Sequence, residues 1–123
     1  MTRYFSQEHE WIEIEGDLGT VGITDYAQGQ LGDITFVDLP AEGATFDKGD
    51  SVAVVDSVKA ASDVYTPVSG TIAEANDVLA DQPELVNTDA EVGGWLFRIT
   101  LSDASELEAL MDEAAYKQYV ESL

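Results

Sequence analysis

The sequence predicts a mainly β fold, a compact barrel or sandwich with a short internal helix and C-terminal helices. The main observation is that short runs of β-branched and aromatic residues recur between turn signals over residues 11–101. A second is a helix-start signature at Thr24, inside this β-rich region. A third is that apolar residues change to helical spacing after residue 104.

The chain begins with a predicted hairpin and a predicted short helix. Residues 11–15 alternate apolar and polar side chains, a turn follows at Gly16, and residues 18–23 resume the extended pattern. Thr24 then has the character of a helix N-cap, with an acidic residue next to it. One or two helical turns are expected over residues 26–30, because Gly32 breaks the pattern.

The middle of the chain predicts more strands and one long loop. The further strands are expected at residues 34–39, 52–58, 71–75 and 95–101. Turn signals separate them, including the sequence Asp-Lys-Gly-Asp at 47–50. Residues 76–94 are rich in Asn, Asp, Pro and Gly, and we interpret them mostly as an ordered loop.

The C-terminal segment predicts one or two helices packed on the barrel. Ser105 and Glu108 have the spacing of a capping box. The apolar residues at helical spacing are Leu107, Leu110, Met111 and Ala114, with Tyr119 and Val120 continuing the face. A chain of 123 residues suits one domain, with the barrel at about 8–101 and the helices at about 104–121.

The charge balance is strongly acidic. Aspartate and glutamate number 25 against 5 lysines and arginines, which gives a formal net charge of −20. Such a field repels phosphate backbones, so we expect no nucleic-acid partner. Self-repulsion of this size destabilises a compact state unless salt screens it. We therefore expect a salt-rich cytoplasm, as in a halophile.

The absence of cysteine excludes disulfides, thiolate metal sites and nucleophilic thiols. Since His9 is the sole histidine, most zinc sites are excluded as well, and we expect no metal. No apolar run has the length of a signal-peptide core or a membrane span, so we expect a cytoplasmic protein without a membrane partner.

Lys59 is the candidate functional residue. It follows the predicted strand that ends at Val58 and precedes the small residues Ala60 and Ala61, at a hairpin end that a large enzyme could reach. The other lysines, Lys48 and Lys117, have ordinary surface settings. Position alone also permits an ordinary solvated turn lysine, and for exposed lysines that is the more common case.

An enzymatic role finds little support. A Schiff-base lysine needs a lowered pKa, whereas Asp56 and Asp63 near Lys59 favour its charged form. The chain has no Gly-x-Ser-x-Gly motif, and residues 43–49 lack the spacing of a phosphate loop. A non-catalytic carrier whose lysine is modified by another enzyme remains possible, as does a structural acidic binding protein.

Several blocks, in order, resemble the glycine cleavage system H protein family. The central block, Asp-Ser-Val-Lys-Ala-Ala-Ser-Asp-Val-Tyr-Thr-Pro-Val-Ser-Gly at 56–70, is similar to the family's lipoylation segment. The other matching blocks are residues 9–12, 21–28, 31–34, 36–40, 83–87 and 94–96. This resemblance extends from about residue 8 to residue 101 and is far more specific than any single motif.

The resemblance implies a lipoyl-type barrel-sandwich hybrid that shuttles a cargo and is not itself an enzyme. Lipoate would be joined in amide linkage to Lys59. The arm would take an aminomethyl group from the pyridoxal-phosphate glycine decarboxylase (P protein), deliver it to the aminomethyltransferase (T protein), and pass electrons to dihydrolipoyl dehydrogenase (L protein). A lipoate-attaching enzyme is the fourth implied partner, and we expect a monomer.

The resemblance also implies roles for residues around Lys59. Glu10 and Asp63 would contact the cationic cargo in a surface cleft, and Asp56, Val58 and Ala60 would be recognised by the lipoylating enzyme. A protonated amine between two carboxylates is a strong, charge-assisted arrangement. Both acids could equally be two of many acids on a solvated face.

Three positions depart from the family pattern. Asp56 replaces the usual glutamate, Glu8 stands where a serine or threonine is common, and the loop 87–94 lacks the usual Pro-Tyr pair. The alternative family is the lipoyl domain of a 2-oxoacid dehydrogenase complex, which would not explain residues 9–11 or the C-terminal helices. A biotin carrier would normally have methionines beside the lysine, where Val58 and Ala60 stand.

Overall fold

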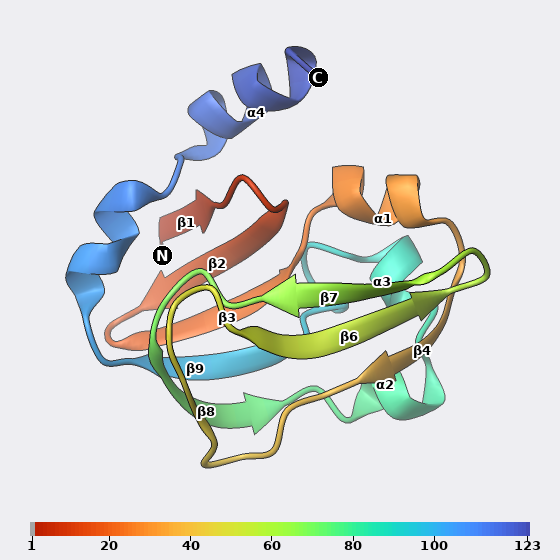
Figure 1. The fold of residues 1–123 in the computed structure, drawn as a ribbon, viewed down its shortest axis with the longest axis horizontal. Helices are drawn as coiled ribbons and strands as arrows, with labels where there is room; N and C mark the ends of the chain where they lie inside the picture. The colour runs from red at the N-terminus through yellow and green to blue at the C-terminus, as the bar shows by residue number, and fades with distance from the viewer. Residues whose placement is uncertain (1) are drawn as a thin grey trace.

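The computed structural model describes residues 2–123 and contains two antiparallel sheets (Figure 1). The larger sheet has the strand order β1 (Thr2–Phe5), β2 (Glu10–Glu15), β3 (Leu18–Ile23), β9 (Phe97–Leu101), β8 (Gly70–Ala75), β5 (Thr45–Phe46). The smaller sheet has the order β4 (Ile34–Asp38), β6 (Ser51–Ser57), β7 (Ala61–Tyr65). The mainly β prediction is confirmed, and the two sheets form an open sandwich.

The core lies between the two sheets. Alternate residues of each strand point into it because side chains of an extended chain alternate between faces. The larger sheet contributes Ile12, Val21 and Phe97, and the smaller sheet contributes Val55 and Val64, all of them buried in one apolar cluster. The first strand, β1, lies before the expected start of the barrel near residue 8, and it pairs with β2 from Thr2 to Phe5.

The internal helix is present where the sequence predicts it. This helix, α1 (Asp25–Leu31), begins after Thr24, whose hydroxyl accepts a hydrogen bond from the amide of Ala27 at 3.2 Å. It ends at Gly32, whose φ of 83° is a conformation that glycine adopts readily. The predicted N-cap and the predicted stop are therefore both confirmed.

The segment 76–94, predicted mostly as an ordered loop, contains two short helices. They are α2 (Val78–Asp81) and α3 (Leu85–Thr88). Each places one apolar residue in the core, Leu79 from α2 and Val86 from α3, and both are fully buried. Single helical turns leave no periodic pattern, so tertiary burial and not local propensity determines them.

The C-terminal segment is helical, with a different start and a different buried residue. The capping box at Ser105 and Glu108 is wrong, because Asp103 caps the 3₁₀ helix η1 (Ala104–Ala109) by accepting from the amide of Ser105 at 3.0 Å. A bridge between Met111 and Phe5 of β1 then interrupts the helix. The following helix, α4 (Glu113–Glu121), lies beside β1 in Figure 1 and buries Tyr116.

Close packing of Trp11 against Gly22 gives a testable feature of the larger sheet. A Cβ at Gly22 would meet three indole atoms at 2.8 to 2.9 Å. The indole cannot shift freely, because its Nε1 donates to the carbonyls of Ile23 at 3.0 Å and Ala90 at 3.1 Å. We expect Gly22→Ala to lower the free energy of unfolding by about 1–3 kcal/mol in urea denaturation. As the control, Gly29→Ala in α1 adds a Cβ with nothing within 4 Å and should leave stability equal or slightly higher.

Candidate functional site

Lys59 lies at the tip of the β6–β7 hairpin. Ser57 and Ala60 form the last hydrogen-bonded pair, since the amide of Ser57 donates to the carbonyl of Ala60 at 2.9 Å. The Ser57 hydroxyl accepts from the amides of Lys59 and Ala60, both at 3.2 Å, and donates to the Ala60 carbonyl at 3.0 Å. This side chain satisfies the turn without glycine, and it leaves Val58, Lys59 and Ala60 exposed.

The Lys59 side chain reaches the end of α1. Its Nζ donates to the carbonyl of Gln30 at 2.9 Å, one of the carbonyls that a helix C-terminus leaves without a partner. A positive charge at this end also complements the helix dipole. The hairpin is joined to the same corner by the amide of Val58, which donates to the carbonyl of Asp33 at 3.0 Å.

A cleft of about 190 Å³ begins beside this contact and runs between α1 and the edge strand β7. Gln30, whose carbonyl holds the Lys59 amine, is one of its lining residues. The complete lining is Glu8, His9, Glu10, Ile23, Tyr26, Ala27, Gln30, Leu31, Val55, Ser62, Asp63 and Val64. The structure therefore brings Glu10 and Asp63, the two acids singled out from the sequence, to one cleft.

Glu10 is the buried acid of the cleft, with 3% of its surface exposed. Its carboxylate accepts a hydrogen bond from the Ser6 hydroxyl at 2.7 Å and another from the backbone amide of Tyr65. Burial nevertheless raises the pKa of Glu10 to about 7, because desolvation outweighs these hydrogen bonds. The cleft thus contains a carboxyl group that a nearby cation would hold in its charged form.

Asp63 and Asp56 lie in more exposed positions. Asp63 is exposed on β7, and its carboxylate accepts from the Ser51 hydroxyl at 3.1 Å. Asp56 is half-buried on β6 and pairs in register with Ala61 and Phe36. Asp56 is not one of the residues that line the cleft.

Ser57 and Asn87 both shape the site, although no local pattern in the sequence indicates a role for either. The Asn87 amide oxygen accepts from the amide of Ile34 at 2.8 Å, while its nitrogen donates to the Gly32 carbonyl at 2.9 Å and to the Gln28 side chain at 3.0 Å. Asn87 therefore fixes the corner at which α1 ends and Lys59 rests. An Asn in a loop-like segment gives no signal of this role without the fold.

The arrangement of the cleft suits the binding of a cation. Within residues 2–123 no group of three or more His, Asp or Glu side chains is placed to bind a metal ion. No helix in the described part of the chain is both long and apolar enough to cross a bilayer. The cleft instead combines apolar walls, such as Ile23, Leu31 and Val64, with the carboxyl groups of Glu10 and Asp63.

Comparison with known proteins gives a consistent set of relatives. The family model described as Glycine cleavage H-protein matches residues 3–123. The "Glycine cleavage system H protein" of Bartonella quintana is 58% identical over 117 residues, covering 95% of this chain and 96% of the relative. The protein of the same name from Escherichia coli O7:K1 is 58% identical over 118 residues, with 95% and 92% covered. The crystal structure of a glycine cleavage system H protein from Mycobacterium marinum matches with a TM-score of 0.89 at 35% identity, covering 98% of this chain and 97% of that one.

Proposed function

The chain belongs to the glycine cleavage H-protein family and is the H component of that system, and we propose that it works there through a lipoyl group on Lys59. The observation that carries this proposal is the single hydrogen bond between the Lys59 amine and the Gln30 carbonyl. Because Gln30 also lines the cleft, an arm attached at Lys59 starts at the mouth of a site that contains carboxyl groups.

The residues present suit such an arm. The apolar walls of the cleft match a hydrocarbon chain, and Glu10 at its buried side suits a cationic amine. When attached, the lipoyl group supplies the dithiol chemistry that this cysteine-free chain lacks. Glu10 and Asp63 are proposed to hold the aminomethyl cargo as its protonated amine, with Asp63 at the exposed side.

The proposed partners follow from membership of the glycine cleavage system. They are glycine decarboxylase, the aminomethyltransferase, dihydrolipoyl dehydrogenase and a lipoate-attaching enzyme. The chain itself is proposed to be a carrier without catalytic activity. Asp56, Val58 and Ala60 surround Lys59 and are proposed to be contacted by the lipoate-attaching enzyme, since all three are at least partly exposed.

The alternative, a lipoyl domain of a 2-oxoacid dehydrogenase complex, is not favoured. The matching family model spans residues 3–123, and this range includes the C-terminal helices that the alternative leaves unexplained.

Attachment is tested by co-expression with a lipoate-attaching enzyme, followed by intact-mass measurement and peptide mapping. The proposal requires one lipoyl group per chain, located on the peptide that contains Lys59 and not on those with Lys48 or Lys117. A chain that gains no lipoyl group from several such enzymes would argue against the carrier function.

We also propose that the protein works in a salt-rich cytoplasm. The ion pairs within residues 2–123 join Arg3 to Glu13 and Glu91, and Arg98 to Glu74. Most of the 25 acids therefore have no cationic partner to offset their repulsion.

We expect the melting temperature to rise by roughly 10 °C between dilute buffer and molar KCl, because salt screens this repulsion. Thermal unfolding followed by circular dichroism measures it. A melting temperature independent of KCl would contradict the salt requirement.

A further inference from the structure

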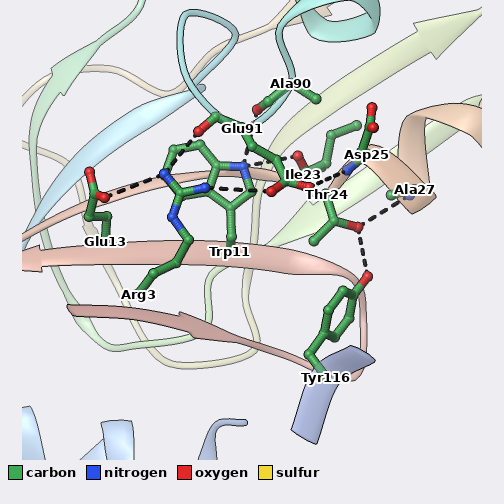
Figure 2. A network of polar contacts seen from close by, with 10 residues as sticks. All are labelled: Arg3, Trp11, Glu13, Ile23, Thr24, Asp25, Ala27, Ala90, Glu91 and Tyr116. Carbon is green, nitrogen blue, oxygen red and sulfur yellow. Dashed lines mark hydrogen bonds and ion pairs between the residues drawn. The ribbon is translucent and has the colours of Figure 1, made fainter. Parts of the chain in front are cut away.

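The hydroxyl of Tyr116, on the C-terminal helix α4, contacts both sides of the cleft region. It lies 2.9 Å from Nδ1 of His9 and 2.7 Å from Oγ1 of Thr24. Figure 2 shows the second contact, with Tyr116 reaching from α4 to Thr24 and Thr24 in turn accepting from Ala27. Tyr116 is buried and far in sequence from both partners.

These two partners belong to two different elements that border the cleft. His9, in the turn between β1 and β2, lines the cleft beside Glu10. Thr24 is the N-cap of α1, the helix whose residues Tyr26 and Gln30 also line the cleft. One hydroxyl group therefore joins the wall that carries the buried acid to the wall that receives Lys59.

We propose that Tyr116 is a positioning residue that fixes the spacing of the cleft walls through His9 and Thr24, and so controls how tightly the loaded arm is held. This proposal rests on the carrier function argued above. It assigns to α4 a task beyond covering the core, although no residue of α4 lines the cleft itself.

The setting of His9 makes it sensitive to this contact. Its backbone has a φ of 67°, unusual for a residue other than glycine, and its ring packs on Tyr26 with centroids 4.7 Å apart. Burial lowers the pKa of His9, which favours the neutral ring. A consistent arrangement has Thr24 donating to the Tyr116 oxygen and Tyr116 donating to Nδ1 of His9, so the His9 proton lies on Nε2.

The ring and the hydroxyl of Tyr116 have separable roles. The ring stacks on Phe5 with centroids 4.7 Å apart and an interplanar angle of 10°, which Tyr116→Phe preserves. Tyr119 offers a matched control on the same helix, because its hydroxyl makes only a long 3.4 Å contact with the carbonyl of Gln7. Tyr119→Phe removes the same atom without affecting His9 or Thr24.

The experiment compares wild type, Tyr116→Phe and Tyr119→Phe, each lipoylated at Lys59 and loaded with the aminomethyl cargo. We expect equal lipoylation by mass, and a loss of cargo to water that is about threefold to tenfold faster in Tyr116→Phe alone. In the unmodified proteins, ¹⁵N NMR should find the His9 proton on Nε2 in wild type and Tyr119→Phe, and a mixture of tautomers in Tyr116→Phe.

The experiment separates a failure of the carrier function from a failure of the positioning role of Tyr116. Absence of lipoylation in wild type would contradict the carrier function, while the His9 tautomer would still test the link to α4. Equal cargo loss in all three proteins, or an unchanged His9 tautomer in Tyr116→Phe, would overturn the positioning role. If Tyr116→Phe does not fold, Thr24→Ser and Thr24→Val provide the test: the serine keeps the hydroxyl and should behave as wild type, whereas the valine should lose cargo faster.

Discussion

Lys59→Arg is expected to abolish attachment of the arm and all carrier activity. The guanidinium stays protonated at every physiological pH, so it cannot accept an acyl group as a lysine amine does. It can still donate to the Gln30 carbonyl, which keeps the C-terminal end of α1 satisfied. Intact mass should show no added lipoyl group, and reconstituted glycine decarboxylation should fall to the level without any carrier.

The matched controls for this variant are Lys48→Arg and Lys117→Arg. Both lysines are exposed, and Lys48 lies in the turn that leads into β6 while Lys117 lies on α4. We expect both controls to be lipoylated and active at wild-type levels. Residual activity of Lys59→Arg above the carrier-free background would show that another residue carries the arm. The assignment of Lys59 as the attachment residue would then be wrong.

The sequence predicts the parts of the fold that have a local cause. Period-two alternation at residues 11–15 gives β2, and the cap at Thr24 with the stop at Gly32 gives α1. Each of these signals depends on neighbouring residues alone. The family resemblance, carried by blocks in order, agrees with the family match over residues 3–123.

The remaining differences have tertiary causes. Single-turn helices α2 and α3 form because Leu79 and Val86 reach the core, which no local pattern encodes. Met111 has helical spacing in the sequence, but in the fold it forms a β-bridge with Phe5, because β1 is an edge strand with unpaired backbone groups there. Burial of Glu10 is equally unpredictable, because a charged residue at the start of an alternating strand normally faces solvent.

Likewise, only part of the candidate site can be predicted from the sequence. Lys59 can be placed at a hairpin tip from its neighbours, but its contact with Gln30 joins residues 29 positions apart. The hydroxyl of Tyr116 joins α4 to His9 across 107 positions. Such contacts arise from packing of whole elements, which explains why the cleft walls are found only in the folded chain.

Glu10→Gln is the second variant with a large expected effect, and it should release the cargo without impairing attachment. The amide has the same shape, and its oxygen can still accept from the Ser6 hydroxyl. It would not hold the cargo amine in its protonated form. The lone pair of an unprotonated amine would expel the sulfur from the methylene carbon between them, and water would convert that carbon to formaldehyde with release of ammonia. A charge-assisted hydrogen bond contributes about 1.5–3 kcal/mol, so we expect cargo loss to be about 10 to 100 times faster.

The measurement is release of formaldehyde from the loaded protein. Asp63→Asn serves as the comparison, because Asp63 is exposed and water screens its charge. Its effect should be several times smaller. Cargo loss in Glu10→Gln at the wild-type rate would contradict a role for Glu10 in holding the amine.

The raised pKa of Glu10 also predicts the direction in which the stability of the fold changes with pH. Burial raises this pKa from 4.5 to about 7 in the fold, so between these values the folded chain binds a proton that the unfolded chain has released. The contribution of Glu10 is therefore fully present below pH 4.5 and is lost as the pH rises through 7. The shift corresponds to on the order of 3 kcal/mol.

In Glu10→Gln the side chain at position 10 does not titrate, whereas the repulsion among the other acids is the same in both proteins. Subtracting the unfolding free energy of Glu10→Gln from that of wild type should therefore isolate the Glu10 term, and this difference should fall as the pH rises from 4.5 to 7. Urea denaturation in molar KCl measures it. A difference that stays constant over this range would mean that Glu10 is ionised throughout, and that the cleft solvates its charge better than its burial indicates.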